Sequence, residues 1–193
     1  MTRIRPKARK ITTVLFDLDG TIVDTNDLII DSCMHALSGH VPEGFGREQI
    51  IPLMGEPLAQ QMRKFTGRED VSALVKAYRE YNLANHDERV SLFPDVRETL
   101  GKLKEAGLRL GVVTTKMRET TIRALKLLEI YSYMDALVTL DDVEHAKPHP
   151  EPVAKAIAAL GSEPSETLMV GDSSVDVVSA SRAGAVPIGV AWS

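Results

Sequence analysis

Two aspartates separated by a single residue follow a short apolar segment near the start of the chain. Residues 13–16 are uncharged and β-prone, which predicts a buried strand, and Asp17 and Asp19 come soon after it. Alternate residues of extended backbone point the same way, so both carboxylates can face one site, where their repulsion would need a cation or shared proton. Gly20, followed by Thr21, lets the chain turn and bring backbone N–H groups near a ligand. A strand ending in an ordinary Asp-Gly turn is the alternative.

A second predicted strand end carries groups that suit phosphate. The strand predicted at 108–114 ends in Thr114, and Thr115 and Lys116 follow it. A hydroxyl supplies one hydrogen-bond donor and an ammonium supplies a point charge, which together fit a phosphate group. A plain helix N-cap is the alternative for these two threonines.

A proline-rich stretch follows the strand predicted at 136–140. Residues 146–152 contain three alternating prolines, which fix a stiff loop with Lys147 at its base. A rigid loop can hold an amine in place, although a solvated lysine is the usual alternative. His145 and His149 are candidates for metal binding or acid–base chemistry, but loop histidines of this kind are more often exposed bystanders.

Two further acids mark the end of a later strand. Asp172 follows the strand predicted at 167–171, and Asp176 falls in the first turn of the next predicted helix. Asp172 near Asp17 and Asp19 would form a cluster of hard oxygen ligands suited to Mg²⁺. Asp176 could serve the helix dipole, orient a lysine or hold a metal-bound water.

Strand and helix patterns alternate along most of the chain. Beyond 13–16, strands are predicted at 108–114, 136–140, 167–171 and 186–191, and helices at 96–106, 119–128, 150–160 and 175–183. Such repeats predict an α/β fold with a Rossmann-like, doubly wound parallel sheet, which binds ligands beyond the carboxyl ends of its strands. The core would comprise residues 11–23 and 91–193, and residues 24–90 predict an inserted all-helical unit.

The composition is that of an ordinary globular protein. The chain has 193 residues, of which 44% are hydrophobic and 26% charged. No apolar run reaches the roughly 20 residues of a membrane span, and residues 1–10 lack the apolar core of a secretory signal. Cys33 is the only cysteine, so we expect no internal disulfide, no membrane partner and a cytoplasmic location. Its place on the apolar face of a predicted helix indicates a buried, inert thiol.

Positive charge is concentrated at the N-terminus. Five of the 23 basic residues, and none of the 27 acidic ones, lie in residues 1–10, which we expect to form a basic, disordered arm. The rest of the chain therefore has 18 basic residues against 27 acidic ones, a balance that disfavours binding of nucleic acid. Local cations would have to bind any anionic substrate.

The polar strand ends occur in the order found in one enzyme family. Asp17-Leu18-Asp19-Gly20-Thr21, Thr114, Lys147, and Gly171-Asp172 with Asp176 together resemble the four motifs of haloacid-dehalogenase superfamily phosphohydrolases. The helical insertion after the first motif is similar to the type-1 cap domain of that family. Residues 112–116 and 138–145 look closest to bacterial pyrophosphatases of the phosphoglycolate phosphatase-like branch. The resemblance covers nearly the whole chain after residues 1–10.

This resemblance implies hydrolysis through an aspartyl-phosphate. Asp17 would attack phosphorus, and Asp19 would protonate the leaving oxygen and then activate a water molecule. Mg²⁺ would be the cofactor, held by Asp17, the Asp19 backbone carbonyl and Asp172. Asp176 would support the metal shell or Lys147.

The resemblance also implies a cradle for the substrate. Thr114 and Lys147 would bind the transferred phosphoryl group as catalytic residues. Further substrate contacts would come from Gly20, Thr21, Thr115 and Lys116. Of these, Lys116 would hold a second anionic group.

A cap domain is expected to close over the site and to choose the substrate. Residues 55–58 match the place where the family's cap reaches the site. Arg63 and Lys64, on the next predicted helix, could meet an anion or could be ordinary surface charges. Chains of this family usually continue beyond residues 191–193 with a short strand and a helix, so the resemblance also predicts exposed apolar surface near Trp192.

Several functions fit these motifs. Hydrolysis of inorganic pyrophosphate is the leading interpretation, and 2-phosphoglycolate or another small phosphomonoester is the alternative substrate. A β-phosphoglucomutase shares the first motif and the cap. A non-enzymatic, receiver-like module also uses acids, a threonine and a lysine on a parallel sheet, but it has no reason for a helical cap. The expected partner is thus a small phosphorylated molecule, and the expected state is a monomer or a homodimer.

Overall fold

A five-stranded parallel sheet forms the centre of the molecule. The computed structural model describes residues 10–192, so the predicted basic arm at 1–10 lies outside the described residues except for Lys10. The strand order is β5-β4-β1-β6-β7, with every neighbouring pair parallel. The strands are β1 (Thr13–Phe16), β4 (Arg109–Val113), β5 (Ala136–Val138), β6 (Thr167–Gly171) and β7 (Val186–Gly189). The predicted α/β fold is confirmed, and β1 lies between β4 and β6 at the middle of the sheet.

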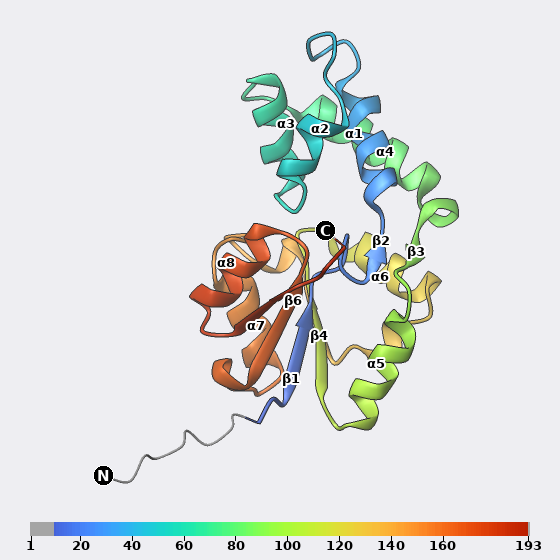
Figure 1. Cartoon of the computed structure of the whole chain (residues 1–193). Helices are drawn as coiled ribbons and strands as arrows, with labels where there is room; N and C mark the ends of the chain where they lie inside the picture. The colour runs from blue at the N-terminus through green and yellow to red at the C-terminus, as the bar shows by residue number, and fades with distance from the viewer. Residues whose placement is uncertain (1–9, 193) are drawn as a thin grey trace.

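Helices cover both faces of this sheet (Figure 1). They are α5 (Val96–Glu105) and α6 (Arg118–Leu127) on one face, and α7 (Glu151–Ala159) and α8 (Ser174–Arg182) on the other. Alternate residues of β1 face the two layers: Val14 and Phe16 join one buried cluster with Leu100. Leu15 joins the second cluster with Val153. Burial of β1 on both faces explains its uncharged sequence.

Residues between the first two motifs form a separate helical layer above the carboxyl ends of the strands (Figure 1). Its elements are α1 (Asn26–Leu37), α2 (Arg47–Ile50), the 3₁₀ turn η1 (Ile51–Leu53), α3 (Leu58–Thr66) and α4 (Ser72–Arg89). We call this layer the cap. It has a small core of its own, to which Ile30, Cys33 and Met62 contribute. The predicted burial of Cys33 is confirmed, and this burial raises the pKa of its thiol to about 12.

A short ribbon connects the cap to the sheet. β2 (Val23–Asp24) pairs antiparallel with β3 (Ser91–Leu92). The segment that enters the cap and the segment that leaves it therefore lie side by side. The sequence did not predict this ribbon, because two residues are too few to show an alternating pattern. Residues 47–53 are divided between two short elements. Pro52 lies in the 3₁₀ turn η1, and α2 ends before it.

Short 3₁₀ turns occupy three of the core connections. They are η2 (Tyr131–Tyr133), η3 (Leu140–Asp142) and η4 (Pro164–Glu166). Among residues 10–192, no helix is long and apolar enough to cross a membrane.

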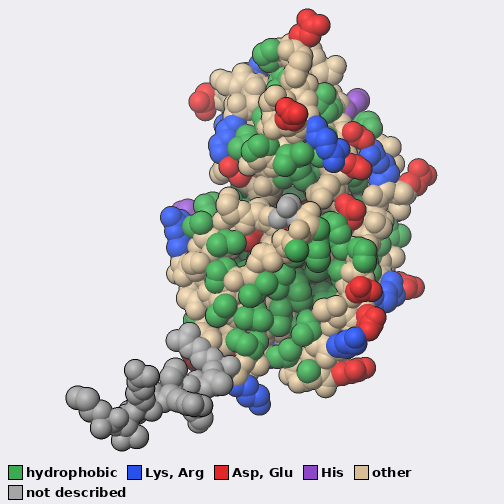
Figure 2. Space-filling model, viewed as in Figure 1, with side chains coloured by type: hydrophobic (Ala, Val, Ile, Leu, Met, Phe, Trp, Pro, Cys, Tyr) green, Lys and Arg blue, Asp and Glu red, His purple; other side chains and the backbone are tan. Residues whose placement is uncertain are grey.

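Apolar surface is exposed beside the end of β7, as predicted. The Trp192 side chain is 52% exposed and stacks on Phe93 with 5.1 Å between ring centroids. Its indole N–H donates a 3.0 Å hydrogen bond to the Gly20 carbonyl. Trp192 borders a hollow of about 440 Å³ lined mostly by apolar residues, among them Val14 and Leu103. Figure 2 shows hydrophobic side chains gathered on this face of the core.

Candidate active site

The loop that follows β5 and η3 delivers one buried lysine to the end of β1. The Lys147 ammonium lies 2.7 Å from Asp17 Oδ1 and 2.5 Å from Asp176 Oδ1, and it donates a third bond of 3.0 Å to the Val113 carbonyl. Lys147 is 2% exposed and Asp17 is 4% exposed. Asp17 Oδ2 has no hydrogen-bond partner among residues 10–192. Lys147 is therefore a structural and electrostatic partner of Asp17, not a solvated surface lysine.

Burial and crowding of charge shift the pKa values of this group. Burial raises the pKa of Asp17 well above its usual range, and the nearby carboxylates of Asp176 and Asp172 raise it further against the opposing effect of Lys147. Burial also raises the pKa of Asp172, helped by Asp176. For Lys147, burial alone would lower the pKa, but the carboxylates of Asp17 and Asp176 raise it above the ordinary value. Negative charge thus exceeds positive charge at this point.

Three of these acids could share a metal ion. One carboxylate oxygen from each of Asp17, Asp172 and Asp176 lies within 4.8 Å of the others. Thr21 Oγ1 donates a 3.2 Å bond to Asp172 Oδ1, and a Cβ at Gly20 would lie only 2.5 Å from Asp172 Oδ2. The glycine therefore allows Asp172 to pack against the turn after β1. Oxygen donors with surplus negative charge fit Mg²⁺.

Asp176 has two further partners in its own helix start. Ser173 donates to Asp176 Oδ2 from its backbone N–H at 3.1 Å and from its hydroxyl at 2.5 Å. This reciprocal arrangement is a capping box for α8. One Asp176 oxygen thus serves the helix and the other serves Lys147.

Asp19 points to a different set of partners. Its Oδ1 accepts bonds from Thr25 Oγ1 at 2.8 Å and from the Lys116 ammonium at 3.0 Å. Its carboxylate is not part of the three-acid cluster. Thr25 occupies the N-cap position of α1, but its side chain makes no capping bond and binds Asp19 instead.

The two threonines after β4 have separate roles. Thr114 is buried, and its Oγ1 accepts a 3.1 Å bond from the Lys116 backbone N–H. Thr115 Oγ1 donates a 3.1 Å bond to the Gly55 carbonyl, which ties the cap to the core. The alternative that either threonine caps the following helix is wrong, because Met117 occupies the N-cap position of α6.

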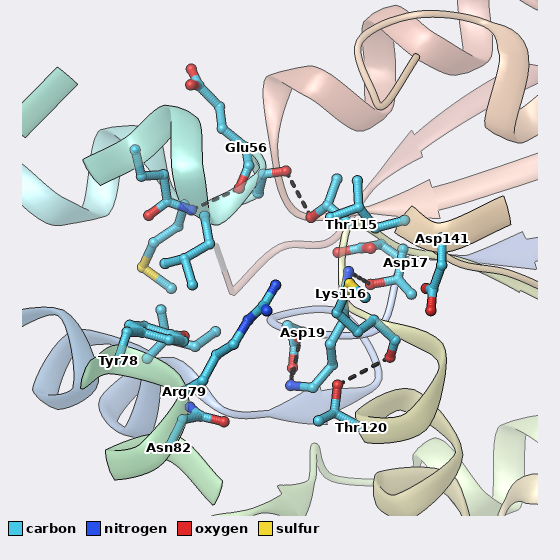
Figure 3. Close-up of a pocket in the computed structure, with 18 of the residues that line it drawn as sticks. Asp17, Asp19, Glu56, Tyr78, Arg79, Asn82, Thr115, Lys116, Thr120 and Asp141 are labelled. Carbon is cyan, nitrogen blue, oxygen red and sulfur yellow. Dashed lines mark hydrogen bonds and ion pairs between the residues drawn. The ribbon is translucent and has the colours of Figure 1, made fainter. Parts of the chain in front are cut away.

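A cavity of about 290 Å³ opens between the cap and the strand ends (Figure 3). Its floor includes Asp17, Asp19 and Thr114, and its cap side includes Gly55 and residues of α4. The core residues of the predicted site therefore open onto the surface that the cap covers. Lys147 and Asp176 are buried behind this cavity.

The sequence missed the cap residues that line this cavity. One face of α4 contributes Tyr78, Arg79, Asn82 and Leu83. The two cap cations considered from the sequence, Arg63 and Lys64, do not line the cavity. Lys64 pairs with Glu56 at 2.6 Å, and the Arg63 Nε–H donates to the Glu69 carbonyl. The helical spacing of Tyr78 and Asn82, and of Arg79 and Leu83, was the available signal.

The two loop histidines lie outside the acid cluster. His145 Nδ1 is 3.1 Å from Glu151 Oε2, and His149 Nδ1 is 4.0 Å from the same oxygen. Both histidines are exposed. In the described part of the chain, no hydrogen bond connects either imidazole ring to Asp17, Asp172 or Asp176.

Comparisons with known proteins agree with this geometry. The model of the haloacid dehalogenase-like hydrolase family matches residues 14–190, a range that contains every predicted site residue. The chain is 46% identical to pyrophosphatase PpaX of Bacillus velezensis over 184 residues, which cover 95% of this chain and 85% of that protein. It is 45% identical to pyrophosphatase PpaX of Bacillus cereus over 183 residues, covering 95% and 84% of the two chains.

Solved structures give a similar result. A haloacid dehalogenase-like family hydrolase from Streptococcus pneumoniae matches with a TM-score of 0.81 and 27% identity, covering 94% of this chain and 85% of that one. A predicted phosphoglycolate phosphatase from Haemophilus somnus matches with a TM-score of 0.77 and 27% identity, covering 94% and 86%. The likeness in each case extends over both the core and the cap.

Proposed function

Because the chain belongs to the haloacid dehalogenase-like hydrolase family, we propose that it hydrolyses inorganic pyrophosphate through a phosphorylated Asp17. The observation that carries the proposal is the buried ion pair of Asp17 and Lys147 at the end of β1, under a capped cavity. The identity to proteins named PpaX supports the choice of pyrophosphate. A cytoplasmic location fits the single buried thiol of Cys33.

The chemistry would proceed in two steps on two aspartates. Lys147 binds Asp17 Oδ1, which leaves Oδ2 as the oxygen that attacks phosphorus. The bond to the leaving phosphate breaks, and Asp19 donates a proton to the departing oxygen. Asp19 then takes a proton from water as that water attacks the phosphorylated Asp17, which releases the second phosphate and restores both side chains.

A divalent cation fits the acids at the end of β1 and β6. Asp17, Asp172 and Asp176 offer oxygen atoms within 4.8 Å of one another, and burial, together with the neighbouring carboxylates, raises the pKa values of Asp17 and Asp172. We propose Mg²⁺, held by Asp17, Asp172 and the Asp19 backbone carbonyl. Bound there, Mg²⁺ would neutralise phosphate charge and keep Asp17 ionised. Asp176 would orient Lys147, to which it is directly bonded.

The transferred phosphoryl group would be bound by groups of the core. Lys147 would supply a positive charge from its buried position beside Asp17, and Thr114 would supply a hydroxyl at the end of β4. The substrate contacts expected from Gly20 and Thr21 are not supported, because their backbone N–H groups donate to the Val23 carbonyl at 2.9 Å and the Leu18 carbonyl at 3.3 Å, and neither residue lines the cavity. Thr115 already bonds the cap at Gly55, so its substrate contact would depend on the position of the cap.

Small phosphomonoesters are the second candidate substrates. The predicted phosphoglycolate phosphatase with 27% identity shares the architecture, and the same two-step chemistry would act on 2-phosphoglycolate. The receiver-like alternative has lost its basis, because the chain belongs to a hydrolase family and has a helical cap. The monomeric or homodimeric state stays a prediction.

Phosphate release tests this proposal. The enzyme would be assayed with Mg²⁺ on pyrophosphate and on 2-phosphoglycolate, with Asp17→Asn as the inactive variant. Asp27→Asn is a matched control, because Asp27 is exposed on the cap and, among residues 10–192, forms its one ion pair with Arg47. We expect a clear preference for pyrophosphate that Asp17→Asn abolishes and Asp27→Asn retains. Preference for phosphoglycolate would keep the chemistry but overturn the substrate.

A further inference from the structure

We propose that Arg79 of the cap binds the second anionic group of the substrate, beside Lys116, for which the family resemblance already implies such a contact. The inference rests on the proposed function and identifies the side chain that would favour pyrophosphate over simple phosphomonoesters. Arg79 comes from α4 and Lys116 from the segment after β4, and both line the cavity above Asp17 and Asp19. Figure 3 shows the Arg79 side chain reaching from the cap into the cavity toward the region of Lys116 and Asp19.

Arg79 has a charge without a protein partner. Its side chain makes no hydrogen bond or ion pair with any residue of the described range 10–192. Arg89 and Arg123 differ in this respect: Arg89 lies 2.6 Å from Asp31, and Arg123 bonds both oxygens of Asp87. The sequence explains the difference, because Val75, Lys76, Asn82 and Leu83 occupy the helical neighbour positions of Arg79 and none of them is an acid. The guanidinium is therefore free to bind an incoming anion.

Lys116, in contrast to Arg79, is already paired with an acid. Its side chain is 12% exposed, and its ammonium contacts Asp19 at 3.0 and 3.2 Å. That pairing offsets the charge of Asp19 and leaves part of the ammonium for the substrate. Lys116 and Arg79 approach the cavity from the core and from the cap, so a group between them would touch both domains.

The charge balance of the cavity makes these two cations necessary. Its lining includes six acids, of which Glu56 is already paired with Lys64: Asp17, Asp19, Glu56, Glu119, Asp141 and Asp172. Arg79 and Lys116 are the basic residues of the lining. Lys147 and a metal at the end of β1 could neutralise the charge of a substrate that has one phosphate. A second phosphate farther out would instead face acids, unless Arg79 and Lys116 bound it.

The geometry of the guanidinium group fits a phosphoryl group. Its planar fork can donate two parallel N–H bonds to two oxygens of one phosphate, whereas an ammonium acts as a point charge. A phosphoanhydride presents such a group directly beyond the oxygen that leaves. A phosphomonoester of a neutral alcohol has no charge at that position. Arg79 should therefore contribute to the first class of substrate and much less to the second.

Substitution of Arg79 tests this selectivity. Wild type and Arg79→Gln would be compared on pyrophosphate and on p-nitrophenyl phosphate, and the quantity of interest is the ratio of the two kcat/KM values. We expect Arg79→Gln to lower that ratio by about 10- to 100-fold, the usual effect of lost hydrogen bonds to a charged group. Arg79→Lys should recover part of the loss. Lys76→Gln is the matched control, because Lys76 is exposed on the same helix and does not line the cavity.

A binding measurement separates recognition from chemistry. Imidodiphosphate, which has two phosphoryl groups and an uncleavable bridge, would be titrated into each protein in the presence of Mg²⁺. We expect weaker binding to Arg79→Gln by a similar factor, and wild-type binding to Lys76→Gln. An equal loss of activity on both substrates, or unchanged imidodiphosphate binding, would overturn the subsite while the phosphohydrolase function stood. A wild type that releases no phosphate from either substrate would instead refute the proposed function.

Discussion

The Lys147 ammonium lies 2.7 Å from Asp17 Oδ1, and both side chains are almost completely removed from solvent. The pair joins the end of β1 to the loop before α7, two segments 130 residues apart in the sequence. Asp176, 2.5 Å from the same ammonium, completes a buried triad with two negative charges and one positive charge. The triad therefore connects the end of β1 with the loop before α7 and the first turn of α8.

Loss of Lys147 should affect stability and activity together. Lys147→Met would leave the carboxylates of Asp17 and Asp176 buried without a cation, and breaking such a pair costs about 3–5 kcal/mol of unfolding free energy. Activity should fall by about 10³-fold, because a charged donor to the phosphoryl group is gone. Urea unfolding and phosphate release measure the two effects. Lys155→Met, an exposed lysine of the neighbouring helix, should keep the activity, and wild-type behaviour of Lys147→Met would contradict the assignment.

Closure of the cap should depend on Gly55. Its φ is +92°, its carbonyl accepts the Thr115 bond, and an added Cβ would lie 2.9 Å from Ser173 Oγ. Gly55→Ala should therefore lower kcat/KM for pyrophosphate by about 10-fold or more. A displaced cap would lose the contacts with the substrate that it makes only in the closed position.

Gly67→Ala provides a matched control for this variant. Gly67 also has a positive φ, +67°, but nothing lies within 4 Å of an added Cβ. Both substitutions should cost about 1 kcal/mol of stability through backbone strain. Only Gly55→Ala should lose activity. Equal kinetic losses in the two variants would show that strain, and not contact with the core, is responsible.

Metal addition should stabilise the fold as well as support activity. Mg²⁺ binding at Asp17 and Asp172, beside Asp176, would relieve the repulsion among these acids and raise the melting temperature, because the unfolded chain has no such site. Chelator should abolish phosphate release, and added Mg²⁺ should restore it. Asp172→Asn should remove the stabilisation by Mg²⁺. An equal rise in melting temperature with KCl at matched ionic strength would indicate a nonspecific salt effect.

One histidine of the cap should make stability depend on pH. Burial lowers the pKa of His86, which is 0% exposed, against the opposing effect of its hydrogen bond with Asp87. The unfolded chain, with a histidine pKa of about 6.5, then binds more protons than the native protein below that pH. Stability should therefore fall as the pH drops below about 6.5.

Substitution of His86 isolates this contribution. His86→Phe should reduce the difference in unfolding free energy between neutral and mildly acidic pH. It would also remove Nε2, a buried atom without a hydrogen-bond partner in the described residues. His40→Gln is a control, because His40 is exposed. An unchanged slope of stability against pH in His86→Phe would contradict the prediction.

The sheet and the core residues of the site could be predicted because their signals are local. The uncharged run of β1 and the acids after it lie within a few residues, and the carboxyl ends of parallel strands meet at one edge. The role of Asp176 was harder to predict from the sequence, because an acid in the first turn of a helix has several possible partners. Only the fold shows that one of its oxygens caps α8 and the other binds Lys147.

The contribution of the cap could not be predicted in the same way. The choice between Arg63, Lys64 and Arg79 depends on how α3 and α4 are rotated against each other and against the core. In the structure Lys64 pairs with Glu56 within the cap, while Arg79 lines the cavity. The pairing of Asp19 with Lys116 spans 97 residues and also escapes local patterns. Contacts of this kind follow from tertiary packing, not from residue type and spacing.

Covalent trapping on Asp17 tests the central claim most directly. The enzyme would be mixed with pyrophosphate and Mg²⁺, quenched in acid and treated with borohydride, which reduces an acyl phosphate to an alcohol and so marks the residue that carried it. The account predicts a mark on Asp17 in the wild type and none in Asp17→Asn. Phosphate release by the wild type with the mark on another residue, or by Asp17→Asn at the wild-type rate, would contradict it.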